Sequence, residues 1–139
     1  MFRTFTLALI LSTVLPCIAQ DAAVKKVGPR YTSPTSGPEM YQAYCASCHG
    51  QAGKGDGPVV AALKGTVPDL TTLAKRNGGV FPAKKVGEFI RGVAVAAAHG
   101  NLDMPVWGPI FHSVSNREAA LVNMRVVNLT KHLESMQVK

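Results

Sequence analysis

Aromatic side chains are scarce in this sequence, and long apolar runs are missing. Phe, Trp and Tyr make up 6% of the 139 residues, so something other than aromatic rings is expected to fill part of the interior. No run reaches the ~18 apolar residues of a membrane-spanning helix, and no segment repeats. The 47% hydrophobic and 17% charged residues are typical of a folded chain. The length predicts a single domain.

Cysteine is also rare, and one of the three cysteines, Cys17, lies in a predicted signal peptide over residues 1–19. Arg3 gives this segment a positive start, an apolar run follows, and small residues precede a cleavage site after Ala19. Cleavage after Ala22 or Ala23 is an alternative. An uncleaved anchor and a lipoprotein acylated at Cys17 are both disfavoured by Pro16. We therefore expect export to the periplasm, with no stable membrane insertion after cleavage.

The mature chain is basic. Removal of Arg3 with the signal leaves 14 basic and 8 acidic residues, a net charge of +6. The basic residues are spread along the chain without interleaved aromatics, so nucleic-acid binding is disfavoured. Solvation of the surface or steering toward an acidic protein partner accounts better for the charge. Residues 20–36 are predicted to form an extended leader, and residues 37–139 the domain itself.

The apolar periodicity predicts a small all-α domain with long loops. Helices are expected over about 38–47, 68–77, 83–91 and 116–136, with a shorter one near 59–63 and mostly loop over 93–116. Pro38 suits a first helical position, and Asp69 is a plausible N-cap. The apolar side of the last helix is expected to comprise Ala120, Val122, Met124, Val127, Leu129 and Leu133.

The sequence Cys45-Ala46-Ser47-Cys48-His49 carries the main chemical signal. The C-x-x-C-H pattern is typical of c-type haem attachment. On a helical turn, both thiols and the imidazole lie on one side, so the thiols reach two vinyl groups while His49 reaches the iron. A thioredoxin-type pair lacks its βαβ context here, and a zinc site lacks two further ligands at suitable spacing. A disulfide and a zinc site remain as minor alternatives.

A second axial ligand is expected on the opposite face of the iron, and Met104 is the preferred candidate. Pro105 holds Met104 toward extended backbone, and a thioether ligand favours ferrous iron. Met40 faces away from the iron, and Met124 and Met136 are expected in the core. The remaining candidates are histidines, namely His99, His112 and His132.

The segments CASCHG, GKGDGP, PDL and MPVWG together resemble the bacterial class I c-type cytochromes. In particular, the chain is similar to the single-haem domains related to the cytochrome c subunit of cbb3-type oxidases. The resemblance covers about residues 37–136. It implies four to five helices wrapped around one covalent, low-spin haem c with His/Met ligation. Gly37 and Tyr41 match the family's opening helix, whereas the closing helix lacks the family's aromatic, so His132 or Leu129 is expected to substitute.

Several supporting roles are expected around the haem. The free nitrogen of His49 should donate to the carbonyl of Gly57 or Pro58. Three residues are equally consistent with propionate contacts and with ordinary packing or solvation: Arg91, His99 and Trp107. The apolar wall is expected to comprise Phe81, Val86, Phe89, Ile90 and Leu102.

The leading hypothesis for function is a one-electron carrier without enzymatic activity, working between redox proteins such as a dehydrogenase and a terminal oxidase. No nucleophile and base pair is visible in the sequence. One alternative is a peroxidase-like enzyme or gas sensor with a displaceable sixth ligand, for which His99 is the distal candidate. Another alternative is an electron-entry subunit of a dehydrogenase or oxidase complex.

Overall fold

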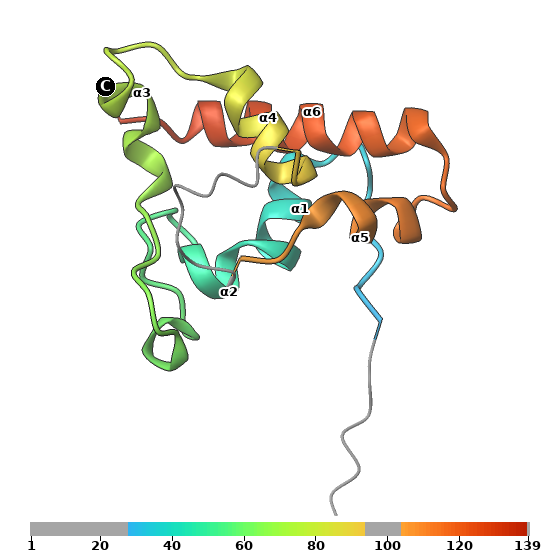
Figure 1. Cartoon of the computed structure of the whole chain (residues 1–139), viewed down its shortest axis with the longest axis horizontal. Coiled ribbons are helices and arrows are strands. Elements are labelled where there is room, and N and C mark those ends of the chain that lie inside the picture. The colour runs from blue at the N-terminus through green and yellow to red at the C-terminus, as the bar shows by residue number, and fades with distance from the viewer. Residues whose placement is uncertain (1–27, 94–103, 139) are drawn as a thin grey trace, which may run out of the picture.

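The computed structural model describes residues 28–93 and 104–138, and this part of the chain is helical without a strand (Figure 1). The predicted all-α class is therefore confirmed, while the predicted signal peptide lies outside the described residues. The described elements are α1 (Gly37–Tyr44), α2 (Ala46–His49), the 3₁₀ turns η1 (Val60–Ala62) and η2 (Leu70–Thr72), α3 (Leu73–Arg76), α4 (Ala83–Arg91), α5 (Trp107–Val114) and α6 (Ala119–Ser135).

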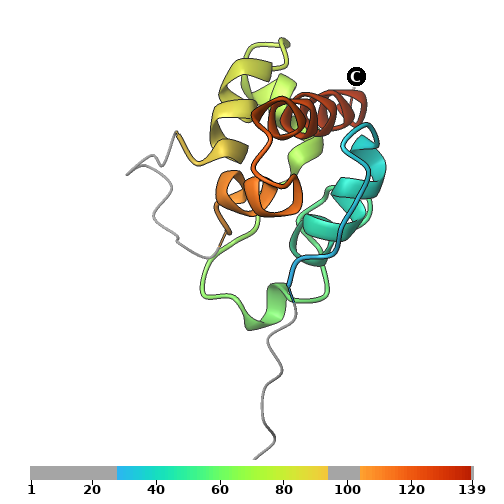
Figure 2. The same ribbon diagram turned by 90° about the vertical axis from the view of Figure 1, so that its right-hand side faces the viewer.

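Helix α6 is the centre of the packing and contacts α1, α4 and α5. Figure 2 shows α6 nearly end-on, with these three helices around it. The fully buried apolar side chains come from α1, α5 and α6, and they are Met40, Tyr41, Phe111, Val126 and Leu129. In the described part of the chain, no helix combines the length and apolarity needed to cross a bilayer.

The buried face of α6 differs from the predicted one. Its apolar members are Val122, Val126, Leu129 and Leu133, which follow helical spacing. Met124 and Val127 are 39% and 40% exposed, so their expected places in the core were wrong. Apolar residues lie on both sides of this helix, and the sequence therefore does not single out the inward stripe. Two polar residues, Arg125 and Thr130, occupy that stripe instead.

Helices α1 and α6 cross closely at Gly37. A Cβ at this position would lie 2.5 Å from the backbone oxygen of Asn128 and 2.7 Å from the Cβ of His132, so only glycine permits the approach. One turn further along α1, the rings of Tyr41 and His132 meet edge to face with centroids 5.3 Å apart. His132 thus takes the place of the missing aromatic, as expected.

Helix α5 lies within the range predicted to be mostly loop, so that prediction was wrong for residues 107–114. Gly108 and Pro109 fall in the first turn of α5, where a proline has no intrahelical N–H bond to lose. Trp107 and Phe111, four residues apart, bury one face of α5 with their rings 6.1 Å apart. Tertiary packing of these rings therefore stabilises a helix that composition alone disfavours.

The other predicted helices are shifted or divided. The expected 38–47 helix breaks at Cys45 into α1 and α2. The expected 68–77 helix begins later, as η2 followed by α3, and Asp69 caps it by accepting the Thr71 N–H at 2.7 Å. The chain end returns to this segment, because Val138 donates its N–H to the Thr71 carbonyl at 2.9 Å.

Candidate functional site

Cys45, Cys48 and His49 lie on the single helical turn that follows α1, with Cys45 between α1 and α2 and the other two residues in α2. Cys45 donates its backbone N–H to Tyr41 of α1, and His49 donates its own to Cys45, each at 2.8 Å. Cys45 is buried, Cys48 is half-buried, and both thiols are free. The sequence-predicted attachment residues are therefore brought together, with two thiols available for bonding on the same turn as a buried imidazole.

The imidazole of His49 is held by a carbonyl different from those predicted. Its Nδ1 lies 3.3 Å from the backbone oxygen of Pro68 and donates to it. Because Nδ1 is engaged, Nε2 is the nitrogen left for a metal. Burial lowers the pKa of His49, with the Pro68 contact opposing this shift, so the ring is neutral as a ligand must be.

The glycine-rich loop after His49, residues 50–58, binds the backbone of the motif. Gly55 donates to the His49 carbonyl at 2.8 Å, and Gly57 donates to the Cys48 carbonyl at 3.0 Å. A Cβ on Gly57 would lie 2.3 Å from the Ser47 oxygen, so the loop needs glycine there. The prediction that Gly57 or Pro58 accepts from the His49 ring was wrong, because this loop satisfies carbonyls of the motif instead.

The thiol of Cys45 does not resemble a reactive redox cysteine. Burial, with a smaller contribution from Cys48, raises the pKa of Cys45 to about 12. Catalytic C-x-x-C thiols have lowered pKa values, and metal ligation requires the thiolate. Within residues 28–93 and 104–138, no group of three His, Cys, Asp or Glu side chains is arranged to hold a metal ion alone. The donor set, two free thiols and a neutral imidazole with free Nε2, fits a haem attached through both sulfurs.

Met104 is half-buried and packs against the hydrophobic core. The chain that follows it lies against the end of α4 at two close contacts. A Cβ on Gly92 would lie 2.1 Å from Val106, and a Cβ on Gly108 would lie 2.5 Å from the backbone oxygen of Arg91. These two contacts hold Val106 and Gly108 against the end of α4, and so limit where Met104 can lie.

Trp107 connects residues 104–107, the Met104 segment, to α1, the helix that precedes Cys45. Its ring is 9% exposed and lies 5.3 Å from the ring of Tyr44, the residue immediately before Cys45. Trp107, three residues after Met104, therefore packs against α1, the helix that leads into Cys45. Trp107 packs in the core cluster, and its alternative role at a propionate stays a prediction.

The other predicted site residues are distributed as follows. Ile90 is buried, and Phe81, Val86 and Phe89 are half-buried, while their role as a haem wall stays a prediction. Met40 is fully buried in the core, and Met136 packs against it. Two further candidates, His99 and Leu102, lie outside the described residues.

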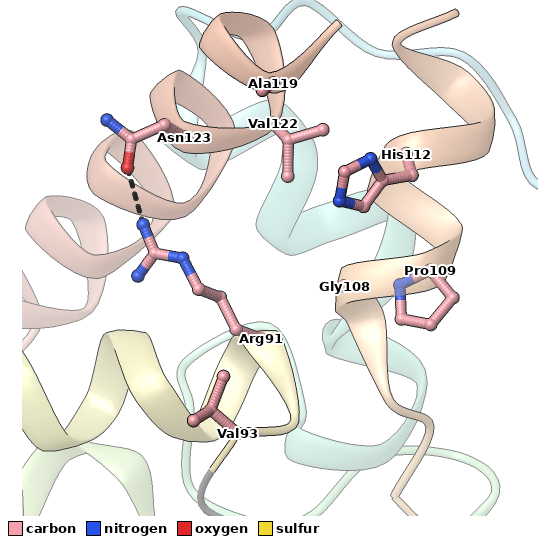
Figure 3. Close-up of a pocket in the computed structure, with 8 residues that line it drawn as sticks. All are labelled: Arg91, Val93, Gly108, Pro109, His112, Ala119, Val122 and Asn123. Carbon is pink, nitrogen blue, oxygen red and sulfur yellow. Dashed lines mark hydrogen bonds between the residues drawn. The ribbon is translucent and has the colours of Figure 1, made fainter. Parts of the chain in front are cut away.

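A groove of about 670 Å³ lies between the end of α4, the start of α5 and the start of α6 (Figure 3). In it, Arg91 donates through Nη2 to the Asn123 side-chain oxygen at 2.5 Å. None of the four predicted ligand residues lines this groove, so it is separate from the attachment turn. Its lining comprises Arg91, Val93, Gly108, Pro109, His112, Ala119, Val122 and Asn123.

We expect a Gly108→Ala substitution to displace the Met104 segment. The added Cβ meets the Arg91 carbonyl at 2.5 Å, a backbone atom that cannot move aside, and overpacking of this kind costs roughly 1–3 kcal/mol. Thermal unfolding should show the loss. Gly87→Ala in α4 is the matched control, because the nearest atom to its Cβ would be the flexible tip of Arg91 at 3.4 Å, an ordinary van der Waals distance. Equal stability of the Gly108→Ala variant and the parent would contradict the close contact.

Sequence reasoning missed two features. Pro68 belongs to the quoted PDL segment, but no sequence pattern indicates that its carbonyl faces His49. Arg125 is fully buried, and its only sequence signal is its position three residues from Val122 and four from Leu129 on the inward stripe of α6.

Comparison with protein families gives one match. A family model described as cytochrome C oxidase, cbb3-type, subunit III matches residues 32–122, a range that includes the attachment turn, Pro68 and Met104. No curated protein and no solved structure matches the chain.

Proposed function

Because the chain belongs to the family of cbb3-type cytochrome c oxidase subunit III, whose members contain a class I c-type cytochrome domain, we propose that it carries single electrons between redox proteins in the periplasm. Haem c, when bound, supplies an iron that alternates between the ferric and ferrous states. We propose one such haem, joined to Cys45 and Cys48 and ligated by His49 and Met104.

The hydrogen bond between His49 Nδ1 and the Pro68 carbonyl is the observation that carries this proposal. It fixes the orientation of the ring and directs Nε2 away from the backbone. The carbonyl also increases the basicity of the imidazole, which strengthens it as an iron ligand. A histidine that served only in packing would not need its second nitrogen left open on the turn that carries two free thiols.

The role of Met104 rests on the packing around it. The Gly92 and Gly108 contacts hold the chain that follows Met104 against α4, and Trp107 packs on Tyr44 of α1, the helix leading into Cys45. A neutral sulfur ligand placed by a rigid segment favours the reduced iron and keeps the sixth position filled. A filled sixth position supports electron transfer in preference to ligand-binding chemistry.

The expected partners are a dehydrogenase as donor and a terminal oxidase as acceptor. The family description supports an oxidase partner, and the predicted signal peptide supports meeting it in the periplasm. Whether the chain moves freely or serves as an electron-entry subunit, the same docking chemistry applies. The excess of basic residues favours a partner with an acidic rim.

The charge of the mature chain predicts how its reactions depend on salt. We expect oxidation by the anionic hexacyanoferrate(III) ion to slow as ionic strength rises, because screening weakens long-range attraction. Oxidation by a cationic cobalt(III) complex, used as the control, should not slow. Stopped-flow absorbance measures both rates. If the rate with the anion is independent of ionic strength, the steering proposal fails.

A further inference from the structure

Arg125 is the largest of the fully buried side chains in the described part of the chain. It extends from α6 toward the core beside apolar residues of the same helix face. A guanidinium stays protonated in proteins. The core therefore contains a permanent positive charge.

The polar partners of this charge are neutral. Arg125 Nε donates to Ser115 Oγ, and Nη1 donates to Thr32 Oγ1, each at 2.9 Å. The ring of Tyr31 lies over the guanidinium, with its centroid 5.3 Å from Cζ. Among the described residues, the one ion pair joins Lys84 and Glu88 on the surface. Hydroxyl dipoles and an aromatic face therefore stabilise the guanidinium without cancelling its charge.

A directed chain of hydrogen bonds leads from Arg125 to the attachment helix. Tyr44 donates its hydroxyl to the Arg30 carbonyl at 2.5 Å. The Thr32 hydroxyl, 2.9 Å from the Tyr44 oxygen, therefore donates to Tyr44 while accepting from Arg125. Tyr44 directly precedes Cys45, and its ring packs on Trp107. The charge thus lies in the cluster that joins the attachment turn to the Met104 segment.

We propose that Arg125 acts as a fixed internal cation that raises the reduction potential of the haem held at the attachment turn. The inference rests on the proposed function. Reduction removes one positive charge from the iron, so a nearby cation favours the reduced state. Charges interact more strongly through a protein core than through water, because the effective dielectric constant is lower. Burial and nearby charge are among the properties that set haem potentials.

A matched pair of substitutions at Thr32 tests the effect of charge while leaving Arg125 in place. Thr32→Asp puts a carboxylate where the guanidinium now meets a hydroxyl, and Thr32→Asn adds a neutral group of the same size. The measurement is a potentiometric titration of the holoprotein. At the same applied potential, we expect the ratio of reduced to oxidised protein to be several-fold lower for the Asp variant than for the Asn variant. A tenfold change in this ratio corresponds to a 59 mV shift of the reduction potential for one electron. Equal potentials for the pair would overturn the proposal.

Removal of the charge gives an independent test. Arg125→Gln should lower the ratio several-fold, whereas Lys131→Gln, which removes an exposed charge from the same helix, should change it less than about twofold. Thermal unfolding distinguishes an effect of charge from an effect of structural damage. Both Thr32 variants disturb the same hydroxyl, so they should lose similar stability while differing in reduction potential. If Arg125→Gln does not fold, the comparison of Thr32→Asp with Thr32→Asn alone decides whether the proposal holds. Absence of haem from the parent protein would refute the proposed function, whereas unchanged potentials with haem bound refute only this inference.

Discussion

A Cys45→Ala/Cys48→Ala double variant is expected to contain no covalently bound haem and to be largely unfolded. In the proposed attachment each thiol binds one vinyl group, so removing both thiols removes every covalent bond to the cofactor. The chain has few aromatic residues and long loops, and we expect the haem to supply much of its buried apolar surface. Losing that surface removes a stabilising free energy comparable to the whole free energy of unfolding of a domain, about 5–15 kcal/mol.

The measurement is haem absorbance that survives denaturing electrophoresis, together with circular dichroism of the purified chain. Cys17→Ala is the matched control, because that cysteine lies in the predicted signal peptide. It should leave the haem content unchanged. Covalent haem in the double variant, or its loss in the control, would contradict the proposed attachment.

Met104→Ala is expected to open the sixth position of the iron. Loss of the thioether should remove the red charge-transfer band of Met-ligated ferric haem and lower the reduction potential, because this ligand favours ferrous iron. The reduced variant should then bind carbon monoxide readily. Absorption spectra with and without carbon monoxide measure the charge-transfer band and the binding of the gas. A redox titration measures the reduction potential.

Met124→Ala is the control for this substitution, because Met124 is 39% exposed on α6 and is not part of its buried face. Its spectrum should match the parent's. If Met104→Ala keeps the charge-transfer band, another residue is the ligand. Met136, which packs against the core, would then be the next position to change.

The sequence predicted the features that depend on neighbouring residues. The C-x-x-C-H spacing places Cys45, Cys48 and His49 on one turn by helical geometry alone, and Asp69 caps its helix through a contact two residues away. The crossing of α1 and α6 was predictable from the family pattern at Gly37, including the substitution by His132.

The features that escaped sequence reasoning depend on distant contacts. The carbonyl that holds His49 belongs to Pro68, nineteen residues away, and the nearer loop was predicted instead. Helix α5 forms because Trp107 and Phe111 bury their rings, against the preference of a Gly-Pro pair. The buried place of Arg125 requires hydroxyls from Thr32 and Ser115, which local periodicity does not reveal.

The central claim is a haem c with both axial positions filled by the chain. Visible absorption spectra of protein matured in a haem-attaching periplasm, oxidised and reduced, before and after carbon monoxide, test it most directly. The account predicts a low-spin haem c spectrum that carbon monoxide does not change, with the red charge-transfer band in the ferric form. A reduced spectrum that shifts readily with carbon monoxide would contradict it, and would favour the sensor or peroxidase hypothesis with His99 as the next residue to test.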